Sequence, residues 1–432
     1  MKKSRLTPIK RIIFLIIFFT ILLCRQSIAD NSIEISDILV VGNKHTNEDV
    51  VTRELLFKTG DFVSDSLLEL SRKRILNLWL FNRVEFQKIP DHGKTALLII
   101  VTERWYLFPY PVFRIEDRDW DKISYGFGLA HNNFRGRNEK MYFSLIFGNR
   151  PGYYFNFIEP WIGEELHLTM NYLLNNYSKE NRFYEFDEKH FDNSLSIGKY
   201  WTKRFYSRIH FSRIDLSVPE EYKMLMPTRS THEVNYGIQL STAYDTRDIY
   251  SYPQHGWLTQ FVIGNYGLFE PLIDYWKFTV DLRKYISWNA FTLAMRFYNI
   301  QSIGSLPVYD YNFIGYTQRI RGHFYTVFPG KHATIGAAEL RYLLIPKRYF
   351  SIKSSLLPDY LTKDLFFGMG LGLFADTGLA WDAKEQLDPD NFKSGFGFGI
   401  HFLIPYVELL RFDVAFNEDF KTQYIFEVGA AL

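Results

Sequence analysis

From Trp105 to the end of the chain, apolar side chains occupy every second position in runs of about ten residues. In one such run, residues 125–129 read Tyr-Gly-Phe-Gly-Leu. A period of two is typical of a β-strand, and a tilted strand of about nine to eleven residues is long enough to cross a bilayer. No helical period persists over this region. The pattern therefore predicts a membrane β-barrel over residues 105–432.

The runs share one strongly apolar face, and their second face is either small or polar. Glycine fills the second face in the later runs 368–372 and 395–399, and polar residues fill it in 166–172. A soluble β-sandwich would bury the apolar face against a second sheet, so it remains an alternative fold. We favour the barrel because the strands are long and aromatic residues make up 18% of the chain.

We count sixteen strands, eleven before a segment without strand pattern, residues 302–332, and five after it. An even number of strands leaves both ends of an antiparallel barrel on the same side. A second irregular stretch, residues 345–363, is an insert that the pattern does not explain. The predicted strands lie near residues 105, 122, 138, 152, 165, 191, 205, 230, 254, 272, 290, 333, 365, 394, 408 and 422.

Segment 302–332 contains the tetrapeptide Ile320-Arg321-Gly322-His323, with a cation and a glycine side by side. The interior of a barrel must be filled, so we expect this loop to fold inward, where an arginine that reaches an acidic wall residue can hold it in place. An exposed loop with a solvated arginine is the alternative. The tetrapeptide alone does not decide between them, whereas the strands on both sides favour the inward loop.

The first 29 residues carry a basic stretch, then the apolar run 12–23, then small residues up to Ala29. This order is typical of a secretory signal peptide, and we expect residues 1–29 to be removed by cleavage after Ala29. A transmembrane anchor is the alternative, but a helix needs roughly twenty residues to span a bilayer. Lipidation of Cys24 is a second alternative, which the large Leu23 before it disfavours.

Removal of the signal changes the charge of the chain. The signal holds six of the 50 Lys and Arg and none of the 48 Asp and Glu, which leaves 44 against 48, a net charge of −4. A mildly acidic chain without clustered Lys and Arg does not favour nucleic acid as a partner. Cys24 is the one cysteine, so the exported chain would hold no disulfide and no thiolate metal ligand.

The sequence contains none of the motifs that indicate an enzyme. The eleven His show no metal-ligand spacing, and neither a Gly-x-Ser-x-Gly elbow nor a dinucleotide-binding loop is present. The acidic and basic residues of 245–248 are better explained as a charged turn than as a metal site. We therefore expect neither enzyme activity nor a cofactor.

Residues 30–104 follow different patterns from the barrel region. A strand comes first, then a helix for which Thr46, with Asp49 three residues on, is a candidate cap. A second helix begins near Ser64, and two alternating strands follow around a turn at 90–93. The expected order is β-α-α-β-β, a compact soluble α+β module.

Several separate stretches resemble motifs of the Omp85 superfamily of outer-membrane proteins. Residues 30–104 resemble a single POTRA domain, and 105–432 resemble the family's transmembrane barrel. The matching stretches are Gly42-Asn43, Gly60-Asp61, Leu80-Phe81-Asn82-Arg83-Val84, Ile100-Val101-Thr102-Glu103, Asn133-Phe134-Arg135-Gly136-Arg137, Phe157-Ile158-Glu159-Pro160-Trp161, Tyr244-Asp245-Thr246-Arg247-Asp248, Ile320-Arg321-Gly322-His323, Glu339-Leu340-Arg341-Tyr342 and Phe374-Ala375-Asp376-Thr377-Gly378.

The resemblance implies a location and a pairing. It implies a barrel in the bacterial outer membrane, a POTRA domain in the periplasm, and a loop motif at 320–323 inside the lumen. It also nominates Asp376 as the partner of Arg321. His323 departs from the family, which has an aromatic residue at that position.

The resemblance also implies a function. We expect an outer-membrane protein insertion factor whose partners are unfolded outer-membrane precursors, outer-membrane lipid, and periplasmic chaperones or accessory lipoproteins. A polypeptide secretion pore of the two-partner type is the alternative, although such pores usually carry two POTRA domains. A structural barrel without a client protein is a third reading.

Two prolines, Pro109 and Pro111, lie in the first predicted barrel strand. Residues two apart in a strand direct their N–H groups to the same neighbour, so both missing donors fall on one side. Proline is usually confined to sheet edges. We expect this side to face strand sixteen and to leave the closure short of two hydrogen bonds; prolines that merely end a short strand are the alternative.

Overall fold

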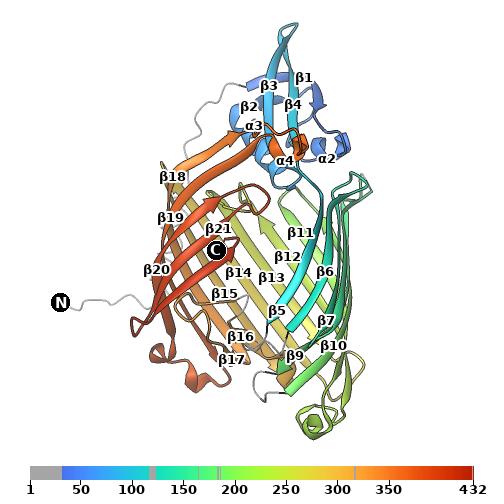
Figure 1. The fold of residues 1–432 in the computed structure, drawn as a ribbon, viewed down its shortest axis with the longest axis vertical. Coiled ribbons are helices and arrows are strands. Elements are labelled where there is room, and N and C mark those ends of the chain that lie inside the picture. The colour runs from blue at the N-terminus through green and yellow to red at the C-terminus, as the bar shows by residue number, and fades with distance from the viewer. Residues whose placement is uncertain are drawn as a thin grey trace, which may run out of the picture.

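The computed structural model describes residues 32–115, 123–163, 165–181, 184, 186–315, 318–430 and 432. The predicted signal peptide, its cleavage after Ala29 and the state of Cys24 lie outside the described residues. Figure 1 shows a small N-terminal module, in blue, at one end of a large tilted barrel. No helix in the described ranges is long and apolar enough to cross a membrane.

The N-terminal module is a four-stranded sheet with helices packed on it. The sheet order is β2-β1-β4-β3, with β1 parallel to β4, and its core includes the fully buried Ile35, Val50, Ile75 and Leu97. The expected β-α-α-β-β order is present, with one short extra strand, β2, between the helices. The elements are β1 (Ser32–Val41), α2 (Glu48–Thr52), β2 (Phe62–Ser64), α3 (Asp65–Leu76), β3 (Phe81–Asp91) and β4 (Lys94–Glu103).

The two helices of the module begin differently. Helix α3 starts after Ser64, as the sequence predicted, and the Ser64 side chain accepts a hydrogen bond from Leu67 N at 3.3 Å. The prediction that Thr46 caps α2 is wrong, because the N-cap is Asn47, which makes no side-chain cap bond. Thr46 is buried instead at the junction with the barrel, where its Oγ1 lies 3.0 Å from Tyr106 Oη.

The barrel wall is one antiparallel sheet of sixteen strands, which confirms the predicted number. Its apolar face points outward, with Tyr125 and Phe127 exposed by 56% and 54%, as a lipid-facing wall requires and a soluble sandwich does not. The strands are β5 (Leu107–Ile115), β6 (Ile123–Phe134), β7 (Glu139–Gly148), β8 (Gly152–Ile162), β9 (Leu168–Asn181), β10 (Phe186–Tyr200), β11 (Phe205–Ser217), β12 (His232–Asp245), β13 (Gly256–Tyr266), β14 (Tyr275–Trp288), β15 (Phe291–Gly304), β18 (His332–Phe350), β19 (Leu365–Trp381), β20 (Lys393–Leu403), β21 (Leu410–Asn417) and β22 (Thr422–Val428).

Between β15 and β18, segment 302–332 forms a loop with a small sheet of its own. Strands β16 (Asn312–Ile314) and β17 (Phe328–Gly330) pair with each other, although the sequence showed no strand pattern here. Ile314 and Ile320 pack with residues of the barrel wall in a buried cluster. Short 3₁₀ turns lie at Val308–Asp310 in this loop and at Glu220–Leu225, Lys384–Gln386 and Pro389–Asn391 elsewhere.

The insert 345–363, which the sequence left unexplained, connects the barrel to the N-terminal module. Strands β18 and β19 run beyond the barrel rim towards the module, and helix α4 (Asp359–Thr362) lies between them (Figure 1). The rings of Trp105 and Tyr360 stack with centroids 4.7 Å apart, and Thr102 Oγ1 donates to Asp364 Oδ2 at 2.6 Å. The insert therefore forms part of the module's seat on the barrel.

Candidate functional site

The tip of loop 302–332 lies inside the barrel against β20. Arg321 is only 3% exposed. Gly322 has a φ of +100°, and a Cβ there would lie 2.5 Å from the carbonyl oxygen of Phe416. On the wall, a Cβ at Gly395 would lie 1.4 Å from the carbonyl oxygen of Arg321. Gly395 on β20 therefore makes room for the loop backbone, which gives a physical reason for a glycine at this position of the bare face seen in the sequence.

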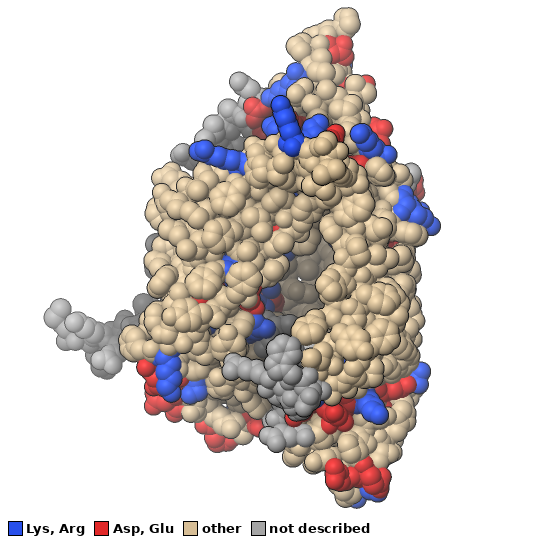
Figure 2. Space-filling model, viewed as in Figure 1, with Lys and Arg blue, Asp and Glu red and all other residues tan. Residues whose placement is uncertain are grey.

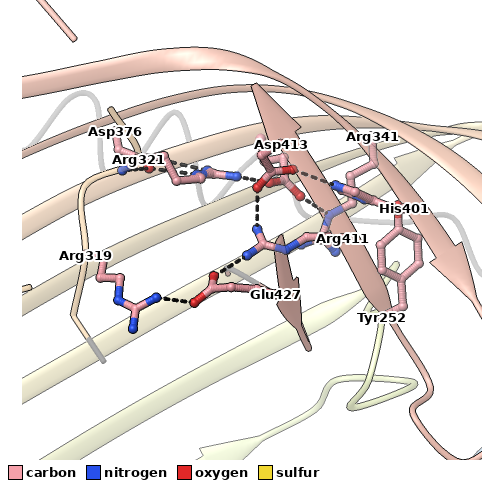
Figure 3. Close-up of polar contacts among 10 residues, drawn as sticks. Tyr252, Arg319, Arg321, Arg341, Asp376, His401, Arg411, Asp413 and Glu427 are labelled. Carbon is pink, nitrogen blue, oxygen red and sulfur yellow. Dashed lines mark hydrogen bonds and ion pairs between the residues drawn. The ribbon is translucent and has the colours of Figure 1, made fainter. Parts of the chain in front are cut away.

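Arg321 is held by the carboxylate of Asp376 on β19 (Figure 3). Its backbone N donates to Asp376 Oδ2 at 3.0 Å, its Nε to the same oxygen at 2.8 Å, and its Nη2 to Oδ1 at 2.8 Å. The guanidinium also stacks on the ring of Phe374, 3.7 Å from the centroid. This bidentate geometry is the one in which an arginine pairs most strongly with a carboxylate.

Glu339 and Arg341, neighbours on one face of β18, extend the cluster. Arg321 Nη1 donates to Glu339, and Arg341 Nε donates to Glu339 Oε1 at 2.6 Å. Arg341 also lies over the ring of Tyr252 at 4.7 Å. In the sequence these two residues indicate only a strand that resembles the family's. Their i, i+2 spacing puts them on one face, but the pattern did not indicate which face.

A second group of charges connects the loop to the last two strands. Arg411 on β21 donates from Nη2 to Glu427 Oε2 at 2.7 Å, and its Nη1 lies 3.1 Å from Asp413 Oδ2. Arg319 of the loop pairs with the same Glu427 on β22. His401 completes the group, with Nδ1 3.0 Å from the Tyr252 hydroxyl. The loop is thus tied to β18, β19 and β22 by arginines matched with carboxylates.

His323, which stands at the family's aromatic position, keeps an aromatic contact. Its ring meets Phe328 edge to face at 5.4 Å, and its Nε2 lies 2.6 Å from Glu418 Oε2 in the turn after β21. Burial would raise the pKa of Glu418, but hydrogen bonds from His323 and from the backbone outweigh burial and bring the pKa to about 2. The substitution therefore adds a polar contact at the loop tip.

The barrel wall is not continuous. The sheet runs from β22 through to β5, and no ladder joins these two strands within the described residues. Figure 1 shows β5, in teal, and the red strands facing each other across this seam, and Figure 2 shows the same face hollowed, with charged side chains visible inside. Strand β22 ends at Val428; Gly429 follows with a φ of +94°, and Leu432 is buried with Tyr285 and Ala294.

Pro109 and Pro111 lie in β5 with their nitrogens toward the seam. Asn132 N donates to Tyr106 O at 2.9 Å, so Tyr106 and Asn132 form a hydrogen-bonded pair in the register of β5 with β6. Bonded and non-bonded pairs alternate along an antiparallel ladder, so Pro109 and Pro111 occupy positions that do not bond to β6. The sequence predicted a closure short of two hydrogen bonds, whereas the described residues of β5 and β22 form no ladder at all.

Polar contacts attach the N-terminal module to the barrel at several places, and two of them involve buried carboxylates. Lys73 Nζ of α3 lies 3.0 Å from Asp248 Oδ2 in the turn after β12, and Asn77 Nδ2 donates to the Asp248 carbonyl at 3.0 Å. Near the seam, buried Arg104 pairs with Glu408 in the turn before β21. These contacts fix the module over one mouth of the barrel.

Burial would raise the pKa of Asp248, but Lys73 and two backbone hydrogen bonds outweigh it and hold this pKa below its usual value. The described residues contain no group of three or more His, Cys, Asp or Glu placed to hold a metal ion. The Asp245 carboxylate is paired instead with Arg247 at 2.7 Å.

Comparisons with known proteins agree on a family. A model described as the Omp85 superfamily domain matches residues 133–431, and a POTRA model, described as surface antigen variable number repeat, matches residues 33–104. None of the curated proteins matches the sequence.

Among solved structures, CdiB from Escherichia coli is 9% identical, with a TM-score of 0.50 over 99% of this chain and 98% of that chain. CdiB from Acinetobacter baumannii is 12% identical, with a TM-score of 0.50 over 92% of this chain and 73% of that chain. BamA from Haemophilus ducreyi lacking POTRA domains 1–3 is 14% identical, with a TM-score of 0.49 over 92% and 83%. At these identities the CdiB likeness concerns the fold alone. Because the family model spans more than half of the chain, the protein belongs to the Omp85 superfamily, with one POTRA domain before its barrel.

Proposed function

We propose that the protein inserts other proteins into the bacterial outer membrane. Its POTRA domain would lie in the periplasm and receive unfolded barrel precursors, and the seam between β5 and β22 would open into the bilayer. The observation that carries this proposal is the unpaired seam. Every other neighbouring pair of wall strands has a ladder, so opening at this seam breaks no ladder hydrogen bond between described residues.

The physical reason lies in the backbone groups at the two edges. An unpaired N–H or C=O group in hydrocarbon costs several kcal/mol, so an unpaired strand edge there favours pairing with another strand. A precursor strand satisfies these groups, and the precursor then gains further stability as it closes its own ladder and buries apolar surface. This source of free energy requires no nucleotide and no cofactor.

The two edges differ in how they are held. Glu427 of β22 is fixed by Arg319 of the inner loop and by Arg411 of β21. On β5, Pro109 and Pro111 present no donor to the seam. We infer that the arginine cluster keeps the β22 side of the wall rigid, while the β5 side pairs weakly and separates readily. Outer-membrane lipid, periplasmic chaperones and accessory lipoproteins are the further partners that this role implies.

The test is reconstitution in liposomes with a urea-unfolded barrel precursor, with folding followed by heat-modifiable gel mobility. We expect the precursor to fold faster than in liposomes that hold an equal mass of an unrelated barrel. No acceleration, together with a secreted protein missing from the medium of a deletion strain, would assign the chain to the two-partner secretion pores. If neither assay shows an effect, the remaining interpretation is a structural barrel without a client protein.

A further inference from the structure

A cavity of about 400 Å³ lies between the POTRA domain and the mouth of the barrel. The POTRA side contributes Arg53 and Arg74, and the barrel side contributes the ends of strands and the turn after β10, including Lys140, Trp161 and Lys203. Four cations line the cavity, against the single carboxylate of Glu54. The arginine cluster around Arg321 does not contribute to this site.

Carboxylates lie near these cations, but most of the cations form no close ion pair among the described residues. Arg74 Nη2 pairs with Glu54 Oε2 at 2.7 Å, but within the described ranges Arg53, Lys140 and Lys203 form no ion pair. Lys203 Nζ donates to a backbone carbonyl, that of Arg53, and Arg53 Nε is buried without a hydrogen-bond partner. Burial lowers the pKa of both Arg53 and Lys203. Arg53 and Lys140 are half-buried, and Lys203 is exposed at the rim. Unpaired cations that are partly removed from water favour an anionic ligand, because a carboxylate would offset the desolvation of Arg53 and Lys140.

The cations are arranged on aromatic rings. The Arg53 guanidinium lies 5.2 Å from the ring centroid of Trp161, the Lys203 ammonium lies 5.6 Å from the same ring, and Lys140 lies 5.9 Å from the ring of Trp79. Tyr200 stacks on Trp161 at 6.2 Å. Aromatic walls favour an aromatic occupant, through ring stacking and burial of a large apolar surface.

The lining side chain of Lys140 lies on the inner face of the barrel wall rather than on the lipid-facing one. On β7, Lys140 lies an even number of residues from buried Ser144 and so shares its face. Phe143 and Phe147, on the opposite face, are exposed. Because side chains alternate between the two faces of a strand, Lys140 lies on the inner face. A membrane lipid on the outer surface does not reach that face, but a polypeptide at the mouth of the barrel does.

We propose that this cavity binds a segment of unfolded polypeptide in which an aromatic side chain lies next to a carboxylate. The aromatic ring would stack against Trp161 and Tyr200, and the carboxylate would accept hydrogen bonds from Arg53, Lys140 and Lys203. The inference rests on the proposed function for the arrival of unfolded clients at this mouth. It adds a selection step, in which acidic and aromatic segments are retained beneath the POTRA domain before they reach the seam.

The test measures binding of dye-labelled six-residue peptides to the purified protein in detergent, by fluorescence anisotropy. One peptide ends in Phe with a free carboxylate, a second is its carboxamide, a third ends in Ala, and a fourth is amidated with Asp next to an internal Phe. We expect the carboxamide and the Ala peptide to bind at least about tenfold more weakly than the first. Binding of the fourth peptide would show that a side-chain carboxylate serves as well as a terminal one.

Variants locate the binding. Lys140→Gln and Lys203→Gln are each expected to weaken binding of the first peptide about tenfold, whereas Lys199→Gln is the matched control. Lys199 also lies over an aromatic ring, that of Trp201. Trp201 lines the cavity, but Lys199 itself does not. Heat-modifiable mobility checks that each variant is folded.

Equal binding of the carboxylate and carboxamide peptides, or wild-type binding by both cavity variants, would overturn the proposal. Binding of phosphatidylglycerol micelles but of no peptide would assign the cavity to lipid and overturn it as well. The assay involves no insertion into a membrane. If the protein binds peptide but does not accelerate insertion in liposomes, the peptide-binding proposal therefore stands and the proposed insertase function is refuted.

Discussion

Arg321 and Asp376 are joined by three hydrogen bonds, one from the backbone N–H and two from the guanidinium, and both side chains are almost fully buried. The hydrogen bond from the backbone N–H fixes the path of the loop at Arg321, and the two bonds from the guanidinium fix the side chain. The pair therefore ties loop 302–332 to the wall at β19, which β20 and β21 separate from the seam strand β22.

Replacing Arg321 by Ala should destabilise the folded barrel. Asp376 and Glu339 would lose their shared cation in a buried site, and removing one partner of a buried pair typically costs about 3–5 kcal/mol. The measurement is the denaturant midpoint of heat-modifiable mobility. Arg319→Ala is the control in the same loop, since its side chain is 29% exposed and such pairs contribute only about 1 kcal/mol or less. Wild-type stability of Arg321→Ala would refute the pairing as a stabilising contact.

The double variant Arg321→Met, Asp376→Leu should be less damaging than the two single losses added together. Arg321→Met leaves buried Asp376 without a cation, and Asp376→Leu leaves Arg321 with Glu339 alone, whereas the double variant removes both charges of the pair. Contacting pairs typically show an interaction of about 0.5–3 kcal/mol. The same unfolding assay is applied to the wild type, the two single variants and the double variant. Strict additivity would mean that the two residues act independently.

Cross-linking the seam should stop insertion. Cysteine at Pro109 in β5, combined with cysteine at Tyr424 or Phe426 in β22, would join the two edges on oxidation, and reductant should restore activity. The matched control is cysteine at Phe412 and Phe426, which already face each other in the β21–β22 register. Full insertion by the oxidised seam variants would reject the seam as the route.

Restoring the missing donors should close the seam more firmly. In the variant Pro109→Val, Pro111→Val, two N–H groups point to β22, and each bond that β22 accepts when the seam closes is worth about 0.5–1.5 kcal/mol. We expect a higher unfolding midpoint and slower insertion. Phe113→Val, which changes an exposed side chain of the same strand and keeps its N–H, should alter neither. Unchanged insertion by the valine variant would show that the prolines serve another purpose.

The contact between the POTRA domain and the barrel should weaken in acid. Asp248 has a lowered pKa, so its contribution is complete above its unfolded pKa of about 3.9 and is lost as the pH falls through the lower folded value. A spin label at exposed Leu70 should report a more mobile POTRA domain below about pH 4. In Lys73→Met the contact should already be looser at neutral pH, with a smaller acid response. A label that is equally immobile in both proteins and at every pH would contradict this.

The sequence by itself determined the elements whose signals are local. The sixteen strands follow from alternation, because a strand at a lipid boundary must present one apolar face whatever its neighbours are. The start of α3 at Ser64 follows from a cap that needs only a hydroxyl and a nearby N–H. Arg321 and Asp376 were paired by the family resemblance, and the structure places them in contact.

The tertiary structure decided what depends on groups distant in the chain. Thr46 lies at the junction with Tyr106 and Asn133 rather than at a helix cap, and the insert 345–363 gains its role only where it meets the POTRA domain. The cluster of Arg341 and Arg411 with their carboxylates could not be read from spacing, because a buried charge is stable only beside partners that the fold brings to it. The open seam likewise requires the placement of two strands at opposite ends of the sheet, which no local pattern encodes.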